Sequence, residues 1–215
     1  MARTYRSPRR EAEAAATRAS IIAAAEKLFV RDGYAATSLK AIAAEAGVSA
    51  PTVQLQGPKH TLLIAAFEVA FAGDEGSHSL AERPVVAEIM AEPDDERAIE
   101  RYVSFLDEAN QRAAGIVRAM AAAADADPGA RAAYQGLETR RRRDLAIAAG
   151  WFVERGRIAE EQRAVAADIL GYILSVDAYL HFTRGREWTR EQWKQWTIHQ
   201  LRHLEEGIPP LSAFS

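Results

Sequence analysis

The sequence contains no cysteine, which excludes disulfide bonds and thiolate chemistry and fits a reducing compartment. It has no apolar run long enough to span a membrane, because Asp177 interrupts the most apolar stretch, from Ile169 to Leu180. Its N-terminal segment is rich in arginine, but no apolar stretch follows, so the pattern of a secretory signal is missing. We therefore expect a cytoplasmic protein that does not bind a membrane.

Signatures of catalysis and of metal binding are also missing. The chain has no Gly-rich phosphate loop, no His-Glu-x-x-His motif and no nucleophile elbow. His199 and His203 have the spacing of two metal ligands on one helix, but no third ligand accompanies them. The sequence therefore predicts no enzyme activity, no metal and no cofactor.

Residues that favour helices and a core are abundant. Of the 215 residues, 48% are hydrophobic, so the chain can bury a sizeable core in one large domain or two small ones. Alanine is common, and runs of β-branched residues bounded by turns are nearly absent. These features predict an all-α fold.

The net charge of −3 conceals an uneven distribution along the chain. Residues 1–60 hold nine Lys and Arg against five Asp and Glu, a balance of +4, whereas the remainder holds eighteen against twenty-five, a balance of −7. A basic N-terminal part suits a polyanionic partner. Residues 1–10 are expected to be a disordered basic arm that either contacts DNA or stays solvated.

The segment from Thr37 to Lys59 carries the most specific local signal. Thr37 or Ser38 can cap a first short helix, Gly47 can end it in the left-handed conformation, and Ser49 can cap a second short helix. Two short helices joined by a turn that contains glycine form a helix-turn-helix, whose second helix enters the DNA major groove. With a helix expected before it and another after it, the predicted DNA-binding domain covers residues 11–73.

Several motifs recur together in this part of the chain: Ile-x3-Ala-x2-Leu-Phe from Ile21, Gly33-Tyr34-x-x-Thr37-Ser38, Ile42-Ala43-x-x-Ala46-Gly47-Val48-Ser49, Thr52-Val53, and Lys59 before Leu62-Leu63. With these motifs, residues 17–72 resemble the N-terminal DNA-binding domain of the TetR family of transcriptional regulators. The chain departs from the family after Val53. There Gln54-Leu55-Gln56 stands in place of an aromatic-rich segment and is one residue shorter.

The predicted DNA-binding residues lie on and around the two short helices: Ser38, Lys40, Ser49, Ala50, Pro51, Thr52, Gln54, Leu55, Gln56 and Lys59. A glutamine amide can pair bidentately with adenine, so Gln54 and Gln56 are either base-reading residues or solvent-exposed ones. Ser38, Thr52 and Lys59 are better suited to phosphate, which positions the protein without specifying sequence.

Residues 74–93 are expected to be a connector with one short helix, and residues 94–208 a second helical domain. Its helices are expected from Asp94 or Asp95 to a break near Asn110, from there to Asp125, and from Pro128 to Arg155. One further helix contains Val165–Leu180 and ends at Gly185, and a last one starts at Thr189. This part resembles the ligand-binding and dimerisation part of TetR-family proteins in the number and order of its helices.

A largely apolar small-molecule site is expected in this second domain. The candidate residues are Tyr102, Phe105, Tyr134, Trp151, Phe152, Tyr172, Asp177 and His181. Large aromatic residues also dominate ordinary cores, so simple packing is the alternative for most of them. Asp177 and His181, one turn apart, are either a pair that orients a ligand or a structural pair.

The last two helices have wide apolar faces, which indicate burial on several sides. The resemblance implies that they pair with a second copy to form a homodimer. The candidate interface residues are Val165, Ile169, Ile173, Val176, Leu180, Trp193, Trp196, Leu201 and Leu204. Core packing is the alternative for the tryptophans.

The resemblance implies a dimeric repressor that binds a pseudo-palindromic operator in double-stranded DNA. A small-molecule effector would release it by displacing the helix that follows Gly57. The alternative is a helical ligand-binding or interaction protein of the same ancestry whose sequence-specific DNA binding has degraded, since the usual aromatic residues after Val53 are missing.

Overall fold

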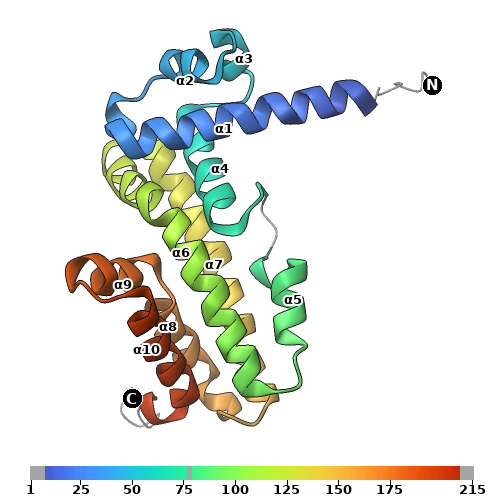
Figure 1. Ribbon diagram of the computed structural model, residues 1–215, viewed down its shortest axis with the longest axis vertical. Helices are drawn as coiled ribbons and strands as arrows, with labels where there is room; N and C mark the ends of the chain where they lie inside the picture. Colours follow the sequence, from blue (N-terminus) through green and yellow to red (C-terminus); the bar gives the residue numbers. More distant parts are fainter. Residues whose placement is uncertain (1–7, 77–78, 209–215) are drawn as a thin grey trace. The chain divides into compact units, whose positions relative to one another are not determined.

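The computed structural model describes residues 8–76 and 79–208, and within these ranges the chain forms helices and no strands (Figure 1). The predicted all-α fold is confirmed. Of the predicted basic arm, residues 1–7 lie outside the described residues. Residues 8–10 belong to helix α1, which spans Pro8–Ala36, so the first helix begins before the predicted Glu11.

The chain divides into two compact units. One contains the residues up to Glu75 together with Gly115–Gln135, and the other contains Gly76–Ala114 together with the residues from Gly136 onwards. Helices α6 (Asp95–Ala126) and α7 (Pro128–Glu154) are long and contribute to both units. The grouping of 115–135 with the N-terminal helices is a feature that the sequence did not indicate.

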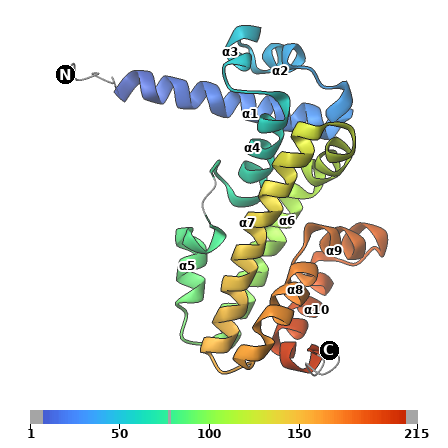
Figure 2. The ribbon, with the colours of Figure 1, turned by 180° about the vertical axis from the view of Figure 1, so that it is seen from behind.

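The first unit contains α1, α2 (Leu39–Ala46), α3 (Ala50–Gln54) and α4 (Lys59–Ala72). The helical backbone of α1 is interrupted at Gly33, which has φ 81° and ψ 166°. The apolar stripe of α1 is buried, α2 and α4 pack against α1, and α3 packs against α2. Helices α2 and α3 lie side by side in both views (Figures 1 and 2). The short helices are thereby stabilised by a core that they could not form alone.

The second unit begins with a short helical turn, η1 (Leu80–Glu82), and α5 (Pro84–Met90). The turn η2 (Glu160–Gln162) leads into α8 (Arg163–Ile173), α9 (Val176–Leu180), the π-helical turn η3 (His181–Gly185), α10 (Arg190–Arg202) and the final turn η4 (Leu204–Gly207). Within this unit, α5 lies on one side of α6 and α7, and α8 to α10 lie on the other (Figures 1 and 2).

Besides the start of α1, two predictions about where helices break differ from the structure. The break expected near Asn110 is wrong, because α6 continues through it. Asn110 is fully buried beside the small residues Ala109, Ala113 and Ala114, and burial of this face outweighs the modest helix propensity of asparagine.

The single helix expected from Val165 to Gly185 is also wrong, because it breaks between α8 and α9. The Ser175 hydroxyl accepts a hydrogen bond from the Ala178 N–H at 2.9 Å, so this side chain caps a new helix instead of continuing the old one. No single helix among the described residues is long and apolar enough to cross a membrane. One pair, 160–173 with 176–185, meets that criterion together but is bent by 41°.

Candidate nucleic-acid interface and ligand cavity

The helix-turn-helix has the predicted caps at each end of its turn. The Ser38 hydroxyl accepts from the Ala41 N–H at 3.1 Å, and the Ser49 hydroxyl accepts from the Thr52 N–H at 3.3 Å. Gly47 has φ 68° and ψ 28°, a left-handed conformation that a residue with a Cβ rarely adopts. These local interactions set the start of α3, the helix expected to enter DNA.

The two glutamines of the recognition segment have different environments. Leu55 is 85% exposed, and Gln54 beside it is exposed, with a side chain that makes no hydrogen bond to any residue in the described part of the chain. The Oε1 atom of Gln56 instead accepts from Arg18 Nη1 at 3.0 Å, so this side chain is turned toward α1. Of the two candidate base readers, the structure leaves Gln54 free.

Arg18 connects the end of the recognition segment to the residues after α4. Its Nε donates to a carboxylate oxygen of Glu75 at 2.6 Å, while Nη1 holds Gln56. The hydrogen bond that Arg18 donates to Glu75 raises the pKa of Arg18 above its already high value, and burial of the guanidinium opposes this. This clamp, formed by Arg18, Gln56 and Glu75, ties down a segment that lacks the aromatic residues expected there.

Lys59 is engaged inside the protein. Its Nζ donates to the backbone carbonyls of Tyr34 at 2.7 Å and Thr37 at 3.0 Å, and lies 4.0 Å from the centroid of the Tyr34 ring. Burial lowers the pKa of Lys59, and the Asp127 carboxylate opposes this shift. Two of the three ammonium protons therefore stabilise the end of α1 and are not available to DNA phosphate.

The Tyr34 hydroxyl extends this network to the turn between α6 and α7. It donates to Asp127 at 2.7 Å, and the other oxygen of that carboxylate accepts from the N–H groups of Gly129 at 2.7 Å and Ala130 at 3.1 Å. Gly129 packs closely on α4, since a Cβ there would lie 2.6 Å from His60 Nδ1. All of these residues belong to the first unit.

The other predicted DNA-binding residues lie on the same segment. Ser38, Lys40, Ser49 and Pro51 are exposed, whereas Ala50 and Thr52 are half-buried. The exposed residues surround the N-termini of α2 and α3, whose free N–H groups favour anions.

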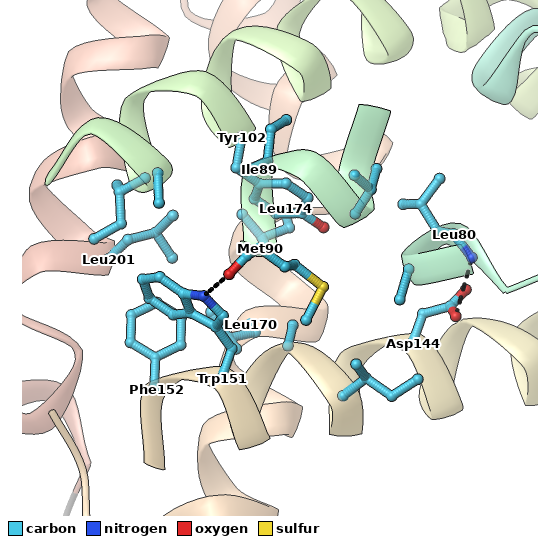
Figure 3. A pocket seen from close by; sticks show the side chains of 16 residues that line it. Leu80, Ile89, Met90, Tyr102, Asp144, Trp151, Phe152, Leu170, Leu174 and Leu201 are labelled. Carbon is cyan, nitrogen blue, oxygen red and sulfur yellow. Dashed lines mark hydrogen bonds between the residues drawn. The ribbon is translucent and has the colours of Figure 1, made fainter. Parts of the chain in front are cut away.

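An apolar cavity lies inside the second unit (Figure 3). The cavity and its opening together enclose about 600 Å³ of empty space. The volume that the centre of a water molecule can occupy is much smaller, about 60 Å³. Its lining comprises Leu80, Ala81, Val86, Ile89, Met90, Ala98, Ile99, Tyr102, Asp144, Ile147, Ala148, Trp151, Phe152, Leu170, Leu174 and Leu201. The small volume that water can reach makes the free space narrow. Asp144 and Tyr102 are the two ionisable side chains among these residues, so the lining is largely apolar.

The polar groups of this cavity differ in how well they are paired. The Trp151 indole N–H donates to the Met90 carbonyl at 3.1 Å, and Asp144 accepts from the Leu80 N–H (Figure 3). Asp144 also accepts from the Ser79 hydroxyl. The Tyr102 hydroxyl has no hydrogen-bond partner in the described part of the chain. Burial, reinforced by the charge of Asp144, raises the pKa of Tyr102 to about 12, so this hydroxyl keeps its proton.

Only some of the predicted ligand-binding residues lie at the cavity. Tyr102, Trp151 and Phe152 line it, whereas Phe105, Tyr134, Tyr172, Asp177 and His181 do not. Tyr172 is 67% exposed, and Tyr134 belongs to the first unit. Asp177 and His181 are exposed, and no hydrogen bond joins them. These five residues do not line this cavity, and a ligand-binding role for them stays a prediction.

Sequence reasoning missed Asp144 as a cavity residue. Asp144, Ile147, Ala148 and Trp151 follow the i, i+3, i+4, i+7 spacing of a single helix face, so a search for a polar residue within an apolar stripe would have found it. The residues that η1 and α5 contribute carry no such signal. They reach the cavity only because α7, which comes later in the chain, also lines it.

The predicted interface residues also divide into two groups. Ile173, Trp193, Leu201 and Leu204 are buried within the chain itself, whereas Val165, Ile169, Val176, Leu180 and Trp196 are partly exposed. Only the second group has surface left to bury against another molecule. Among the described residues, no group of three His, Cys, Asp or Glu side chains could hold a metal ion.

Comparison with known proteins supports the resemblance. Residues 21–54 match the model of the family described as bacterial regulatory proteins, tetR family. A search of curated proteins gave no match. The matched residues include α2, the turn and α3, which is the part of the chain with the DNA-binding geometry.

Three solved structures share the fold over most of both chains. A proposed transcriptional regulator from Pseudomonas aeruginosa PAO1 has 20% identity and a TM-score of 0.65, covering 88% of this chain and 90% of that chain. A proposed TetR-family transcriptional regulator from Mesorhizobium loti MAFF303099 has 22% identity and a TM-score of 0.63, covering 86% and 93%. A proposed fatty acid metabolism regulator from Clostridium perfringens has 15% identity and a TM-score of 0.59, covering 89% and 99%. Residues 21–54 therefore match the TetR family model over the helix-turn-helix, and the chain as a whole shares the fold of these three structures.

Proposed function

We propose that the protein is a dimeric repressor that binds a pseudo-palindromic operator and is released by a small apolar effector. The observation that carries this proposal is the free end of α3, where Gln54 and Leu55 are exposed beside a fully capped turn. A Gln amide can pair with adenine, and an exposed Leu can contact a thymine methyl group. The N-termini of α2 and α3 would hold the phosphates on either side.

The dimer would place two such helices on one face of the DNA. Val165 and Ile169 on α8 and Trp196 on α10 are partly exposed apolar residues and could pair with a second copy. A two-fold axis would then present the recognition helices to half-sites about 34–36 Å apart.

Release by an effector requires that the cavity and the DNA-binding unit respond to each other. Helix α6 carries the cavity residues Ile99 and Tyr102 near its start and leads directly into Asp127, which binds Tyr34. An effector that prefers the arrangement unable to bind DNA would weaken operator binding. A coupling free energy of about 1–3 kcal/mol would give a several-fold to hundredfold response.

A fluorescence-anisotropy titration against the DNA that flanks its own gene tests this function. We expect tight binding that resists excess nonspecific competitor and weakens as salt is raised, because phosphate contacts release counterions. Binding that competitor abolishes on every fragment would contradict the proposal. It would favour the alternative, a helical ligand-binding protein that has lost sequence-specific reading.

The variant Gln54→Ala tests the base-reading role directly. We expect affinity for the specific site to fall roughly tenfold, because one bidentate contact discriminates by about 1–3 kcal/mol. Affinity for competitor DNA should stay unchanged, since that binding depends on phosphate contacts. The same titration on both DNAs measures this, and an equal loss on both would show that Gln54 does not read a base.

The variant Arg18→Ala tests the clamp formed by Arg18, Gln56 and Glu75. We expect specific affinity to fall roughly three- to tenfold, because the end of α3 loses its attachment to α1, with the partial exposure of the ion pair limiting the effect. Arg31→Ala is the matched control, since Arg31 is exposed and its side chain binds only the neighbouring Asp32. Equal losses in the two variants would mean that only the lost positive charge matters.

A further inference from the structure

The Tyr102 hydroxyl is a hydrogen-bond donor inside an otherwise apolar cavity. The side chain extends from α6 toward Met90 and Leu174, and its hydroxyl has no partner in the described residues (Figure 3). Tyr102 is only half-buried, and its hydroxyl is not among the buried unpaired atoms of the described residues, so water can reach it in the cavity. A ligand that displaces this water must supply an acceptor, because a donor left in an apolar site without a partner costs free energy.

We infer that the cavity binds an uncharged, largely apolar molecule with one hydrogen-bond acceptor, such as a ketone, ester or ether oxygen, which accepts from Tyr102. This inference rests on the proposed ligand response and specifies the class of its effector. The donor is retained across the physiological range, because the hydroxyl stays protonated.

Charge in the lining excludes an anionic ligand. None of the sixteen lining residues is Lys, Arg or His. The charge of Arg141 reaches Tyr102 from outside the lining, but this guanidinium is already bound to Glu138 at 3.5 Å and to the Gly171 carbonyl, so it is not a free counterion for a bound carboxylate or phosphate. Asp144 would add repulsion, since its charge acts on the Tyr102 hydroxyl to which such a ligand would bind.

A cationic ligand is also disfavoured. The Asp144 oxygen Oδ1 already accepts from the Ser79 hydroxyl and the Leu80 N–H, so it serves as a cap for η1. A cation would have to leave water for a lining that is apolar on every other side.

The size and lining of the cavity favour small, largely apolar molecules. Trp151 and Phe152 meet edge to face, with ring centroids 5.0 Å apart at 81°, and form a rigid wall. Met90, whose carbonyl accepts from Trp151, also lines the cavity (Figure 3), and its flexible thioether side chain can adapt to the ligand. A planar aromatic ketone fits these conditions.

Four probes of one size test the inference on the full chain in the absence of DNA. Acetophenone is neutral with an acceptor, ethylbenzene has no acceptor, benzoate is an anion, and 1-phenylethylamine is a cation at neutral pH. Isothermal titration or ligand-observed NMR gives each affinity. We expect acetophenone to bind most tightly, ethylbenzene more weakly, and the two ions not measurably.

Two variants assign the selectivity to its residues. Tyr102→Phe keeps the ring and should weaken acetophenone roughly three- to tenfold while leaving ethylbenzene unchanged, because only the hydrogen bond is removed. Tyr172→Phe, on the exposed face of α8, is the matched control and should change neither. Asp144→Asn keeps an acceptor for η1 and should increase benzoate binding.

Three results would overturn the inference: preferential binding of an ion, an acetophenone affinity that Tyr102→Phe leaves unchanged, or no binding of either neutral probe. Failure of the proposed function has a different signature. If acetophenone binds as expected but the protein does not bind specific DNA, the ligand class stands and the repressor function does not.

Discussion

Replacing Tyr34 with alanine is expected to lower the free energy of unfolding by about 3–5 kcal/mol, the range for loss of a buried aromatic ring. The ring is 4% exposed, stacks on Phe29 with a centroid distance of 5.6 Å, and has the Lys59 ammonium 4.0 Å away. Alanine removes these contacts and leaves a cavity at the end of α1. Urea unfolding followed by circular dichroism measures the loss, and DNA binding should weaken with it.

The matched variant Tyr34→Phe keeps the ring and removes only the hydroxyl that donates to Asp127. We expect it to show a much smaller loss of stability, because the packing of the ring is preserved. If Tyr34→Ala were no more destabilising than Tyr34→Phe, the ring would contribute little and the prediction would be wrong.

The same network has a pH dependence of defined sign. The hydrogen bond from the Tyr34 hydroxyl, together with those from the Ala130 and Gly129 N–H groups, lowers the pKa of Asp127. A carboxyl group with a lowered pKa stabilises the folded protein above its ordinary pKa, and this contribution is lost as the pH falls through the folded value. Asp127→Asn should therefore have a lower free energy of unfolding than the unmodified protein at about pH 7. Acidification below about pH 4 should lower the free energy of unfolding less in this variant than in the unmodified protein.

Replacing Trp193 with alanine is the second large expected effect, also about 3–5 kcal/mol. The side chain is fully buried and meets Tyr179 edge to face, with ring centroids 4.9 Å apart at 82°. Its size and complete burial mean that α10 would lose its main contact with the core of the second unit. Chemical unfolding at several protein concentrations measures the loss and separates it from effects on assembly.

Two variants give this prediction its controls. The Trp193 indole N–H is buried without a hydrogen-bond partner in the described residues, so Trp193→Phe removes a costly unpaired donor as well as some volume. We therefore expect Trp193→Phe to be much less destabilising than Trp193→Ala. Tyr172→Ala, on an exposed aromatic residue, should change stability by no more than about 0.5 kcal/mol. An alanine variant that altered only assembly would contradict the assignment of Trp193 to the core.

The sequence by itself determined the helix-turn-helix, because every signal there is local. Ser38 and Ser49 cap helices through N–H groups three residues away, and Gly47 adopts its left-handed turn without help from distant residues. The apolar stripe of α1 and the start of α10 after Thr189 were predictable for the same reason, since periodicity and caps act within a few residues.

Only the tertiary structure decided which of the predicted DNA-binding side chains are left without hydrogen bonds to other described residues. Gln56 is held by Arg18, which is 38 residues away in the chain, and Lys59 is held by two carbonyls more than 20 residues away, whereas Gln54 has no such partner. The cavity likewise needs η1, α5, α6, α7, α8 and α10 together. Local propensity specifies helices and turns, but partners distant in sequence are specified only when the chain packs, because burial and hydrogen bonding there depend on the whole fold.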